Sequence, residues 1–240
     1  MQKPVFLAGW LRKSRLLTAD EFERLKMGAE VLEQDAHGIK VLRMPNGDIL
    51  KLFRVKRLIS SARMYSHARS FCRNAERLHA LGFPTVIIRQ LFHFPDRIHS
   101  AVLYQPLPGK TLRQMALAGE LDQDLLKRMA GFIANLHQHG VLFRSLHFGN
   151  IVQTREGRLG LIDIADLSIQ PFALSCTARL RNFRHLCRLA PDRLAFGKRG
   201  WELFLQTYCE ASHLRLCREK SFFGKAARLF DVWSLQEGRL

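Results

Sequence analysis

The sequence predicts an α+β protein, in which a small antiparallel sheet is followed by a helical region. Three observations support this fold class. Short apolar strands between residues 30 and 55 are joined by turn residues, one long helix separates them from a second pair of strands, and amphipathic helices dominate after residue 109. With 240 residues, 47% of them hydrophobic, the chain can bury a core in one large domain or in two small units.

The first part of the chain alternates short elements with tight turns. Thr18 and Glu21 have the spacing of a capping box, so a short helix is expected to run to about Lys26. Three strands are then predicted, at residues 30–34, 39–44 and 49–55. Asn46-Gly47, between the second and third of these strands, is typical of a hairpin turn.

A long helix and two more strands complete the sheet-forming part. The helix is predicted from about Ser60 to Leu81, because Gly82 and Pro84 end it. The two strands are predicted at residues 85–94 and 98–104. We therefore expect five strands, with one helix inserted after the third.

Residues 105–109, Gln-Pro-Leu-Pro-Gly, mark the clearest boundary in the chain. The predicted division is an N-terminal helical extension over residues 1–29, a sheet-bearing part over 30–105 and a helical part over 106–240. Helices are expected in this last part at residues 121–137, 178–189 and 201–210, with a helical tail from Ser221. Two short strands are expected near residues 151–152 and 159–164.

The charge of the chain is its most unusual bulk property. The 38 Lys and Arg residues against 21 Asp and Glu give a net charge of +17, which points to a polyanionic partner: nucleic acid, an anionic membrane surface or a phosphorylated substrate. Five scattered cysteines form no C-x-x-C pair, so reduced thiols and a cytoplasmic location are expected. No apolar stretch approaches the length of a membrane span, so the protein is predicted to be soluble or peripheral.

Residues 142–163, LFRSLHFGNIVQTREGRLGLID, carry the most informative motif. Asn150 and Asp163, 13 residues apart, resemble the loop asparagine and the metal-binding aspartate of the protein-kinase-like phosphotransferases. In that family the frame is H-R-D-x-x-x-x-N or H-G-D-L-H-x-G-N, and its aspartate acts as the base. Ser145 occupies that position here. The resemblance implies a protein-kinase-like bilobal fold with a small antiparallel-sheet lobe and a reduced helical lobe.

The same resemblance implies ATP and Mg²⁺ as cofactors and assigns residues to them. Asn150 and Asp163 would be the metal ligands. Lys51, on the third predicted strand, would neutralise the nucleotide's phosphates. Glu76 is the single glutamate between residues 58 and 94, and it would form an ion pair with Lys51. Gly38, in the turn at residues 35–38, would belong to the loop that covers the phosphates.

The loop itself leaves its chemistry open. Arg144 matches the family's loop arginine, which neutralises local acids, and His147 matches a histidine that is chiefly architectural. Ser145 cannot take a proton as an aspartate does, and general-base help is worth ~10²–10⁴-fold. The chain could therefore be a slow kinase, a kinase that uses another base such as His147 or Asp166, or a nucleotide-binding pseudokinase with a regulatory or scaffolding role at the cell envelope.

The acceptor is suggested by the later helices. Residues 179–189 and 201–208 resemble the final helices of the bacterial lipopolysaccharide core kinases, which phosphorylate heptose or Kdo sugars of the inner core. The resemblance spans about residues 30–211. It implies an anionic glycolipid or membrane surface as partner, and a position on the inner face of the cytoplasmic membrane. A basic nucleic-acid-binding protein is the third alternative, although no nucleic-acid-binding motif is present.

Overall fold

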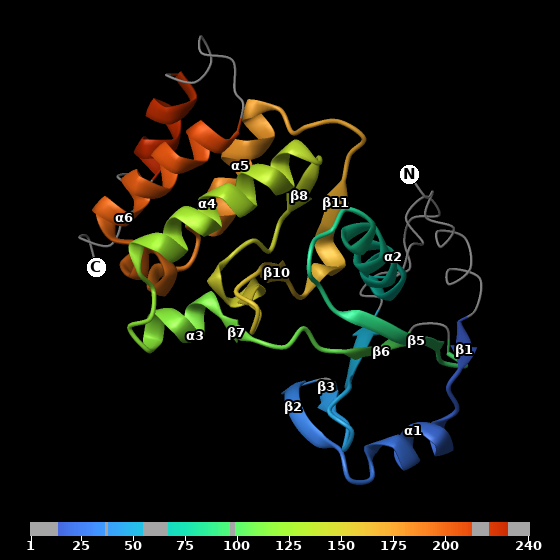
Figure 1. Ribbon diagram of the computed structural model, residues 1–240. Helices are drawn as coiled ribbons and strands as arrows, with labels where there is room; N and C mark the ends of the chain where they lie inside the picture. Colours follow the sequence, from blue (N-terminus) through green and yellow to red (C-terminus); the bar gives the residue numbers. More distant parts are fainter. Residues whose placement is uncertain (1–13, 37, 55–66, 97–98, 213–220, 230–240) are drawn as a thin grey trace. The chain divides into compact units, whose positions relative to one another are not determined.

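The structure, a computed structural model, describes residues 14–36, 38–54, 67–96, 99–212 and 221–229. It confirms the α+β class. The chain forms two compact units: a sheet unit of Met1–Leu107 with Leu161–Asp166, and a helical unit of Pro108–Gly160 with Leu167–Leu240 (Figure 1). The boundary lies two residues beyond the predicted one, and the short return of residues 161–166 to the sheet unit is not part of the predicted division.

The sheet unit contains six strands in the order β1-β5-β6-β4-β3-β2. Their bounds are β1 Arg15–Leu16, β2 Glu30–Asp35, β3 Gly38–Arg43, β4 Ile49–Arg54, β5 Ile87–His93 and β6 His99–Gln105. Five of these strands were predicted. The sixth, β1, pairs in parallel with β5, so Arg15 and Leu16 belong to the sheet itself.

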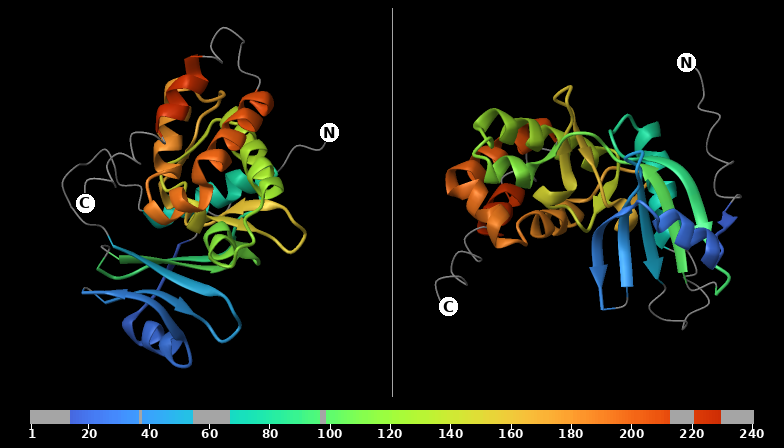
Figure 2. Two further views of the ribbon diagram at one scale, coloured as in Figure 1. Left: turned by 90° about the vertical axis from the view of Figure 1, so that its left-hand side faces the viewer. Right: turned by 90° about the horizontal axis from the view of Figure 1, so that it is seen from below.

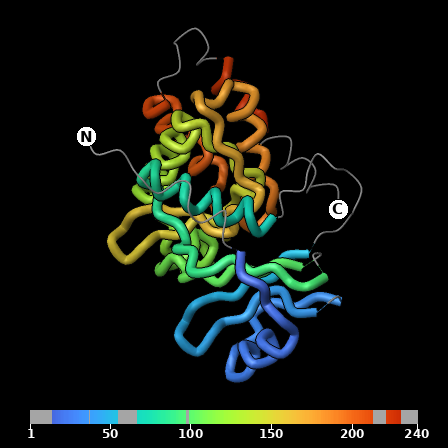
Figure 3. Tube along the Cα trace, turned by 90° about the vertical axis from the view of Figure 1, so that its right-hand side faces the viewer, coloured from blue at the N-terminus to red at the C-terminus, as the bar shows by residue number. Residues whose placement is uncertain are grey.

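The N-terminal helix and the first hairpins follow their local sequence signals. Helix α1 (Ala19–Lys26) begins after Thr18, whose hydroxyl accepts from the Glu21 amide, as the capping spacing predicts. At the β3–β4 turn the Asn46 side chain accepts from the Asp48 amide at 3.0 Å, and Gly47 has a positive φ of 85°. Figure 3 traces the chain through α1 into these hairpins.

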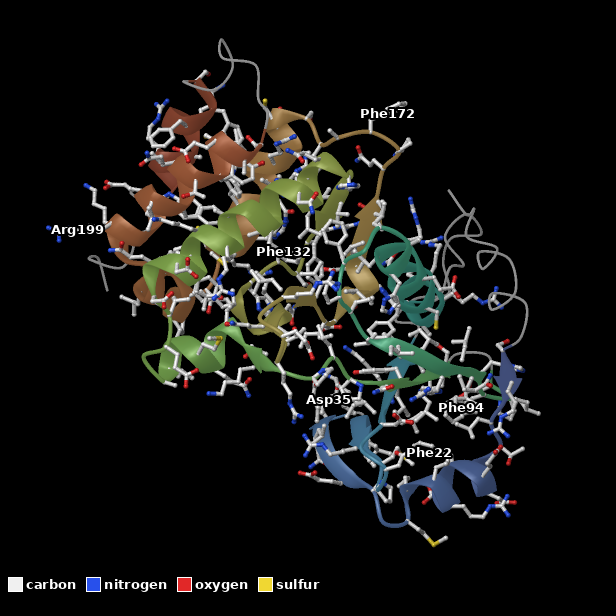
Figure 4. All side chains as sticks on the ribbon, in the orientation of Figure 1. Phe22, Asp35, Phe94, Phe132, Phe172 and Arg199 are labelled. Atoms are coloured by element: carbon white, nitrogen blue, oxygen red, sulfur yellow. The ribbon has the colours of Figure 1, made fainter. Side chains whose placement is uncertain are left out.

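Two helices cover opposite faces of the sheet (Figure 1). On one face, Leu42 and Leu50 are buried with Phe22 of α1, whose ring meets Phe94 edge-on at 5.6 Å (Figure 4). On the other face, Phe71 of helix α2 (His67–Ala80) packs against aromatic rings of β4 and β6. Because side chains alternate along a strand, Lys51 points to the α2 face while Leu50 points to α1. Residues 60–66 of the predicted long helix lie outside the described residues.

The helical unit is built around α4 and α6, which lie side by side (Figure 2). Its helices are α3 Leu112–Leu117, α4 Gln123–Gln138, α5 Cys176–Leu186 and α6 Ala190–Ala211. Its short strands are β7 Lys110–Thr111, β8 Val141–Phe143, β9 Ile151–Gln153, β10 Leu159–Leu161 and β11 Leu167–Ile169. Strands β7, β8, β11 and helix α3 were not predicted, since each is too short to show a periodic pattern.

Helix α6 begins 11 residues before its predicted start. Pro191 stands in the first turn, where a proline is favoured, and the helix bends at Gly197, whose φ of 60° is not helical. Gly197 and the basic residues beside it interrupt the helical spacing of apolar residues, so the sequence pattern does not show that the helix is continuous. The sequence therefore reveals only the part that follows the bend.

The last described segment, residues 221–229, is helical and belongs to the helical unit. Phe222 and Ala226 are buried, and the indole of Trp201 donates to the Ala226 carbonyl at 3.3 Å. These apolar residues therefore pack onto the unit. In the described part of the chain, no helix is both long and apolar enough to cross a bilayer.

Candidate functional site

A lysine and an aspartate that lie 112 residues apart in sequence meet in the sheet unit. Lys51 Nζ, on β4, lies 2.5 Å from Asp163 Oδ1. The lysine side chain is 19% exposed and the aspartate 48%, so the pair sits at a surface with the carboxylate turned towards solvent. The structure thus brings together two of the residues that the sequence assigned to nucleotide and metal.

The backbone of Asp163 adopts a conformation that side chains rarely tolerate. Its φ of 53° makes it the one non-glycine residue in the left-handed region among the described residues. Such a conformation persists where the surroundings enforce it, and functional sites are where such residues gather. The left-handed backbone therefore supports a functional role for Asp163, and argues against Asp163 being only the residue that ends a strand.

Neighbouring elements of the sheet unit enforce this conformation from both sides. Before Asp163, the Leu161 amide donates to Pro84 at 3.0 Å, and its carbonyl accepts from the Thr85 hydroxyl at 2.7 Å. After it, the buried Asn74 amide of α2 donates to the Ile164 carbonyl at 2.7 Å. Asp163 therefore stands on a short bridge that is fixed at both ends, which explains why residues 161–166 belong to the sheet unit.

The predicted ion pair between Lys51 and Glu76 is wrong, because Lys51 pairs with Asp163. Glu76 lies half-buried on α2, and burial raises the pKa of its carboxyl above the ordinary value. No ion pair joins it to a described cation. The sequence shows that the helix carries an acid, but it does not show that the ion pair with Lys51 is formed by an aspartate 112 residues away.

Two further side chains complete the surroundings of Asp163 and Glu76. Burial, and then the negative charge of Asp163, raises the pKa of the Tyr104 phenol, which places this ring within electrostatic range of the carboxylate. Burial, and then the Glu76 charge, raises the pKa of the Cys72 thiol to about 12. Cys72 is therefore a packing residue with an inert thiol.

Gly38 opens β3, opposite Asp35 of β2, with a φ of 115°. A side chain at this position would meet no atom within 4 Å, so the backbone borders open space. The Lys40 ammonium lies 3.4 Å from Asp35 and 3.1 Å from Glu33, which ties the base of the hairpin. His37 lies outside the described residues, and the predicted contact of Gly38 with phosphate stays a prediction.

The predicted catalytic loop lies in the helical unit, between β8 and β9, and contains the single turn η2 (Phe148–Asn150). The side-chain amide nitrogen of Asn150 donates to the Ser145 carbonyl at 2.9 Å. This bond fixes the orientation of the amide and leaves the carbonyl oxygen as the atom that could bind a cation. Asn150 is buried, so its position is set by the fold of the loop.

The other loop residues differ in how far they match their predicted roles. The His147 ring accepts from the Gly149 amide at 3.1 Å through Nδ1, and its Nε2 lies 3.2 Å from the Asn150 amide nitrogen. Both nitrogens thus face the loop, which agrees with an architectural role. Arg144 is exposed and forms no ion pair with a described acid, so the predicted neutralising contact is not seen.

A buried aspartate anchors the loop to α6. Asp192 accepts two bonds of 2.9 Å from the Arg113 guanidinium and one of 2.9 Å from the Phe148 amide. Such a bidentate, charge-assisted pair fixes geometry as well as charge. No role for Asp192 was predicted from the sequence. The signal that could have found it is that Asp192 is the single acid between Asp166 and Glu202.

The start of the loop is held by a buried hydrogen-bonded chain. The Asn182 amide nitrogen donates to the Phe143 carbonyl, so its oxygen is an acceptor and must receive the Nε2 proton of His137 at 3.0 Å. His137 Nδ1 therefore accepts from the Tyr208 hydroxyl at 2.8 Å, and that hydroxyl accepts from Arg179 at 3.0 Å. The bonds fix one neutral tautomer of His137 and join α4, α5 and α6 to β8.

The oxygen atoms at these positions suit a hard cation. Magnesium takes one or two protein oxygens and completes its shell with water and substrate phosphates, and a carboxylate at Asp163 with an amide oxygen at Asn150 is such a set. Among the described residues, no three His, Cys, Asp or Glu side chains form a group that could hold a metal alone. Asp163 lies in the sheet unit and Asn150 in the helical unit, so their shared ligation stays a prediction.

Comparisons with known proteins give a distant likeness. No family model and no curated protein matches the chain. Similar solved structures include the bifunctional kinase-methyltransferase WbdD, with 17% identity and a TM-score of 0.45, covering 80% of this chain and 46% of that chain. WbdD in co-crystals with the kinase inhibitor LY294002 gives 16% identity, a TM-score of 0.43, and 75% and 42% coverage. This chain spans less than half the length of WbdD.

The chain's own elements follow the α+β order that the sequence predicted. Three antiparallel strands precede one long helix and two more strands, and a helical unit with a short-stranded loop follows. The lysine of the third of these strands meets the aspartate that follows β10. Strand β1 and helix α1 are additions before this core order.

Proposed function

We propose that the protein is an ATP-dependent phosphotransferase that uses Mg²⁺ and acts on a sugar in polysaccharide or glycolipid synthesis. One observation carries the proposal. The backbone of Asp163 is held in the left-handed region, and its half-exposed carboxylate lies 2.5 Å from the Lys51 ammonium. A carboxylate and an ammonium group side by side match the positive ion and the negative phosphates of a metal–nucleotide complex. Asp163 would offer its carboxylate to the ion, and Lys51 would turn to a phosphate oxygen.

Each unit would contribute to the nucleotide site in a distinct way. In the sheet unit, β4 carries Lys51, and the bridge fixed by Thr85 and Asn74 carries Asp163. In the helical unit, the Ser145 carbonyl orients the Asn150 amide so that its oxygen is available to a cation. The bound ion would supply positive charge against the phosphate oxygens, which is the largest electrostatic need of phosphoryl transfer.

Turnover without an aspartate at position 145 would be slow. Phosphoryl transfer gains most from positioning and from charge on a loose transition state, so a site that lacks its base keeps part of its activity. His147 is occupied in holding the loop, which weakens its case as a substitute base. The missing aspartate at position 145 also supports a second candidate, a pseudokinase that binds MgATP and serves a regulatory or scaffolding role at the cell envelope.

For the acceptor we propose a heptose or Kdo sugar of the lipopolysaccharide inner core, reached from the inner face of the cytoplasmic membrane. The support is the resemblance of residues 179–189 and 201–208 to the lipopolysaccharide core kinases, together with the net charge of +17. Several of the matching residues, among them Arg179, Asn182 and Tyr208, are buried in the helical unit. They account for the fold of that region, and the acceptor must be identified by assay.

The test measures transfer and binding in the same proteins. Purified full chain is incubated with γ-labelled ATP, Mg²⁺ and lipopolysaccharide core lacking the candidate phosphate, and thermal stability is recorded with and without MgATP. We expect labelled core and a higher Tm in wild type, loss of both in Asp163→Asn, and retention of both in Asp124→Asn. Asp124 is an exposed acid of α4 that makes an ordinary surface ion pair with Arg128, so it provides a matched control.

The outcomes separate the candidates. A raised Tm without transfer would support the pseudokinase. A wild-type protein whose Tm is indifferent to millimolar MgATP would reject both nucleotide-dependent functions.

A further inference from the structure

One stretch of the helical unit carries cations and almost no acids. Residues 167–201 hold seven Lys and Arg residues and a single acid, Asp192. Asp192 is buried and engaged by Arg113 and the Phe148 amide, so its charge does not offset the surface. The exposed part of this stretch therefore carries one sign of charge.

Helix geometry places two of these cations, Arg181 and Arg184, on one face of α5. Arg181 and Arg184 are exposed, and Arg188 follows just beyond the helix end. Positions three and four apart on a helix share a face, whereas Asn182 and Phe183 between them are buried. Lys198 and Arg199, at the bend of α6, extend the exposed series.

These five cations are not held by acids of their own unit. None of Arg181, Arg184, Arg188, Lys198 and Arg199 forms an ion pair with a described carboxylate. In the sheet unit, by contrast, four cations pair with acids over short distances: Arg15 with Glu21, Lys26 with Glu23, Lys40 with Glu33 and Arg43 with Glu30. Positive charge on the α5 side is thus available to an external anion.

Large apolar side chains are exposed in the same stretch. Phe172, in the loop before α5, is 79% exposed, and Leu194, in the second turn of α6, is 76% exposed. In the view of Figure 4, Phe172 and Arg199 stand out at opposite ends of the helical unit. The charged and apolar residues therefore extend along the unit, which is more surface than a small anion needs.

We propose that this basic face docks the protein on an anionic lipid bilayer. By the basic face we mean the exposed arginines Arg181, Arg184 and Arg188, together with the exposed Phe172, Leu194, Lys198 and Arg199 of the segments on either side of them in the sequence. Cations near such a surface attract it through its negative potential, and apolar side chains among them insert into the headgroup region. An exposed leucine suits lipid better than nucleic acid, whose binding relies on phosphate contacts and base stacking. The proposal deepens the proposed function, since an acceptor sugar on a glycolipid lies at such a surface.

The test uses vesicles of phosphatidylcholine with and without phosphatidylglycerol and the full chain. The variant Arg181→Gln/Arg184→Gln/Arg188→Gln should bind the anionic vesicles about fivefold less well for each arginine, or roughly 100-fold in all. Binding of wild type should fall as salt rises and be weak on the neutral vesicles. Phe172→Ser/Leu194→Ser should weaken binding while its salt dependence stays that of wild type.

The matched control removes the same charge elsewhere. Lys26→Gln/Lys40→Gln/Arg43→Gln changes the net charge equally in the sheet unit, and it should keep nearly wild-type vesicle binding. Equal losses in the two triple variants would overturn the proposal in favour of a diffuse charge effect. Unchanged binding in the α5 variant, or tight RNA binding that the α5 variant loses while vesicles bind no protein, would overturn it as well. MgATP stabilisation is measured in parallel, so a failure of the nucleotide site is distinguished from a failure of this face.

Discussion

Lowering the pH should destabilise the helical unit through His137. The imidazole is fully buried between α4, α5 and α6, with Tyr208 donating to one nitrogen and Asn182 accepting from the other. Burial lowers the pKa of His137 to about 3, and although the bond to Asn182 acts in the opposite direction, the Arg179 cation adds to the lowering. A second proton would face a hydroxyl that already donates, so protonation breaks the chain that holds β8.

The magnitude follows from the difference between folded and unfolded states. In the unfolded chain this histidine has its ordinary pKa of 6.5, so on acidification the unfolded state takes up the proton first. The stability that neutral His137 provides is complete above pH 6.5 and is lost progressively as the pH falls towards 3. At pH 5, 1.5 units below the ordinary value, the loss is about 2 kcal/mol at ~1.4 kcal/mol per unit.

Urea unfolding of wild type and His137→Gln at pH 8 and pH 5 isolates this effect. The gap in the free energy of unfolding between the two proteins should shrink by about 2 kcal/mol at the lower pH. An equal gap at both pH values would refute the reasoning. If His137→Gln does not fold, NMR of wild type decides instead: an imidazole that is protonated at pH 5 would contradict the prediction.

Three further changes test separate parts of the structure. Asp192→Ala should lower the free energy of unfolding by ~3 kcal/mol, because Arg113 and the Phe148 amide lose a shared buried partner; a loss under about 0.5 kcal/mol in urea melts would count against that anchor. Ser145→Asp should raise phosphotransfer by up to ~10²–10⁴-fold, and an unchanged rate in the labelled-ATP assay would mean that the base is not limiting. Burial raises the pKa of the Glu76 carboxyl, so the ionised side chain destabilises the fold at pH 7. Glu76→Gln should therefore raise the Tm at pH 7, and by less as the pH falls; a gain in Tm that grows on acidification would contradict this.

Local sequence signals anticipated the elements that depend on neighbouring residues. The Thr18 cap and the Asn46-Gly47 turn are each decided within four residues, and the structure confirms both. Strand β1 is only two residues long and gains its place by pairing with β5, so no pattern in the sequence marks it. The bend at Gly197 interrupts the helical rhythm of α6, which is why its first turns were missed.

The site divides in the same way. Motif positions singled out Lys51 and Asp163, and the structure shows that their side chains form an ion pair. The choice of Glu76 as the partner of Lys51 failed because that pairing depends on distances across the fold. The left-handed backbone of Asp163 depends on bonds to residues that are distant in sequence, so the sequence does not reveal it. Asp192 was within reach of sequence reasoning: a lone acid in a strongly basic stretch, beside a helix start, calls for a buried cationic partner.

Calorimetric titration with ATP, in the presence and absence of Mg²⁺, tests the central claim that Lys51 and Asp163 form a metal–nucleotide site. The account predicts that wild type binds ATP more tightly with Mg²⁺, that Asp163→Asn loses this metal dependence, and that Lys51→Met weakens binding under both conditions. The two substitutions act on opposite partners of one ion pair, so each serves as the control for the other. Binding that is equal in all three proteins, or independent of Mg²⁺ in wild type, would contradict the account.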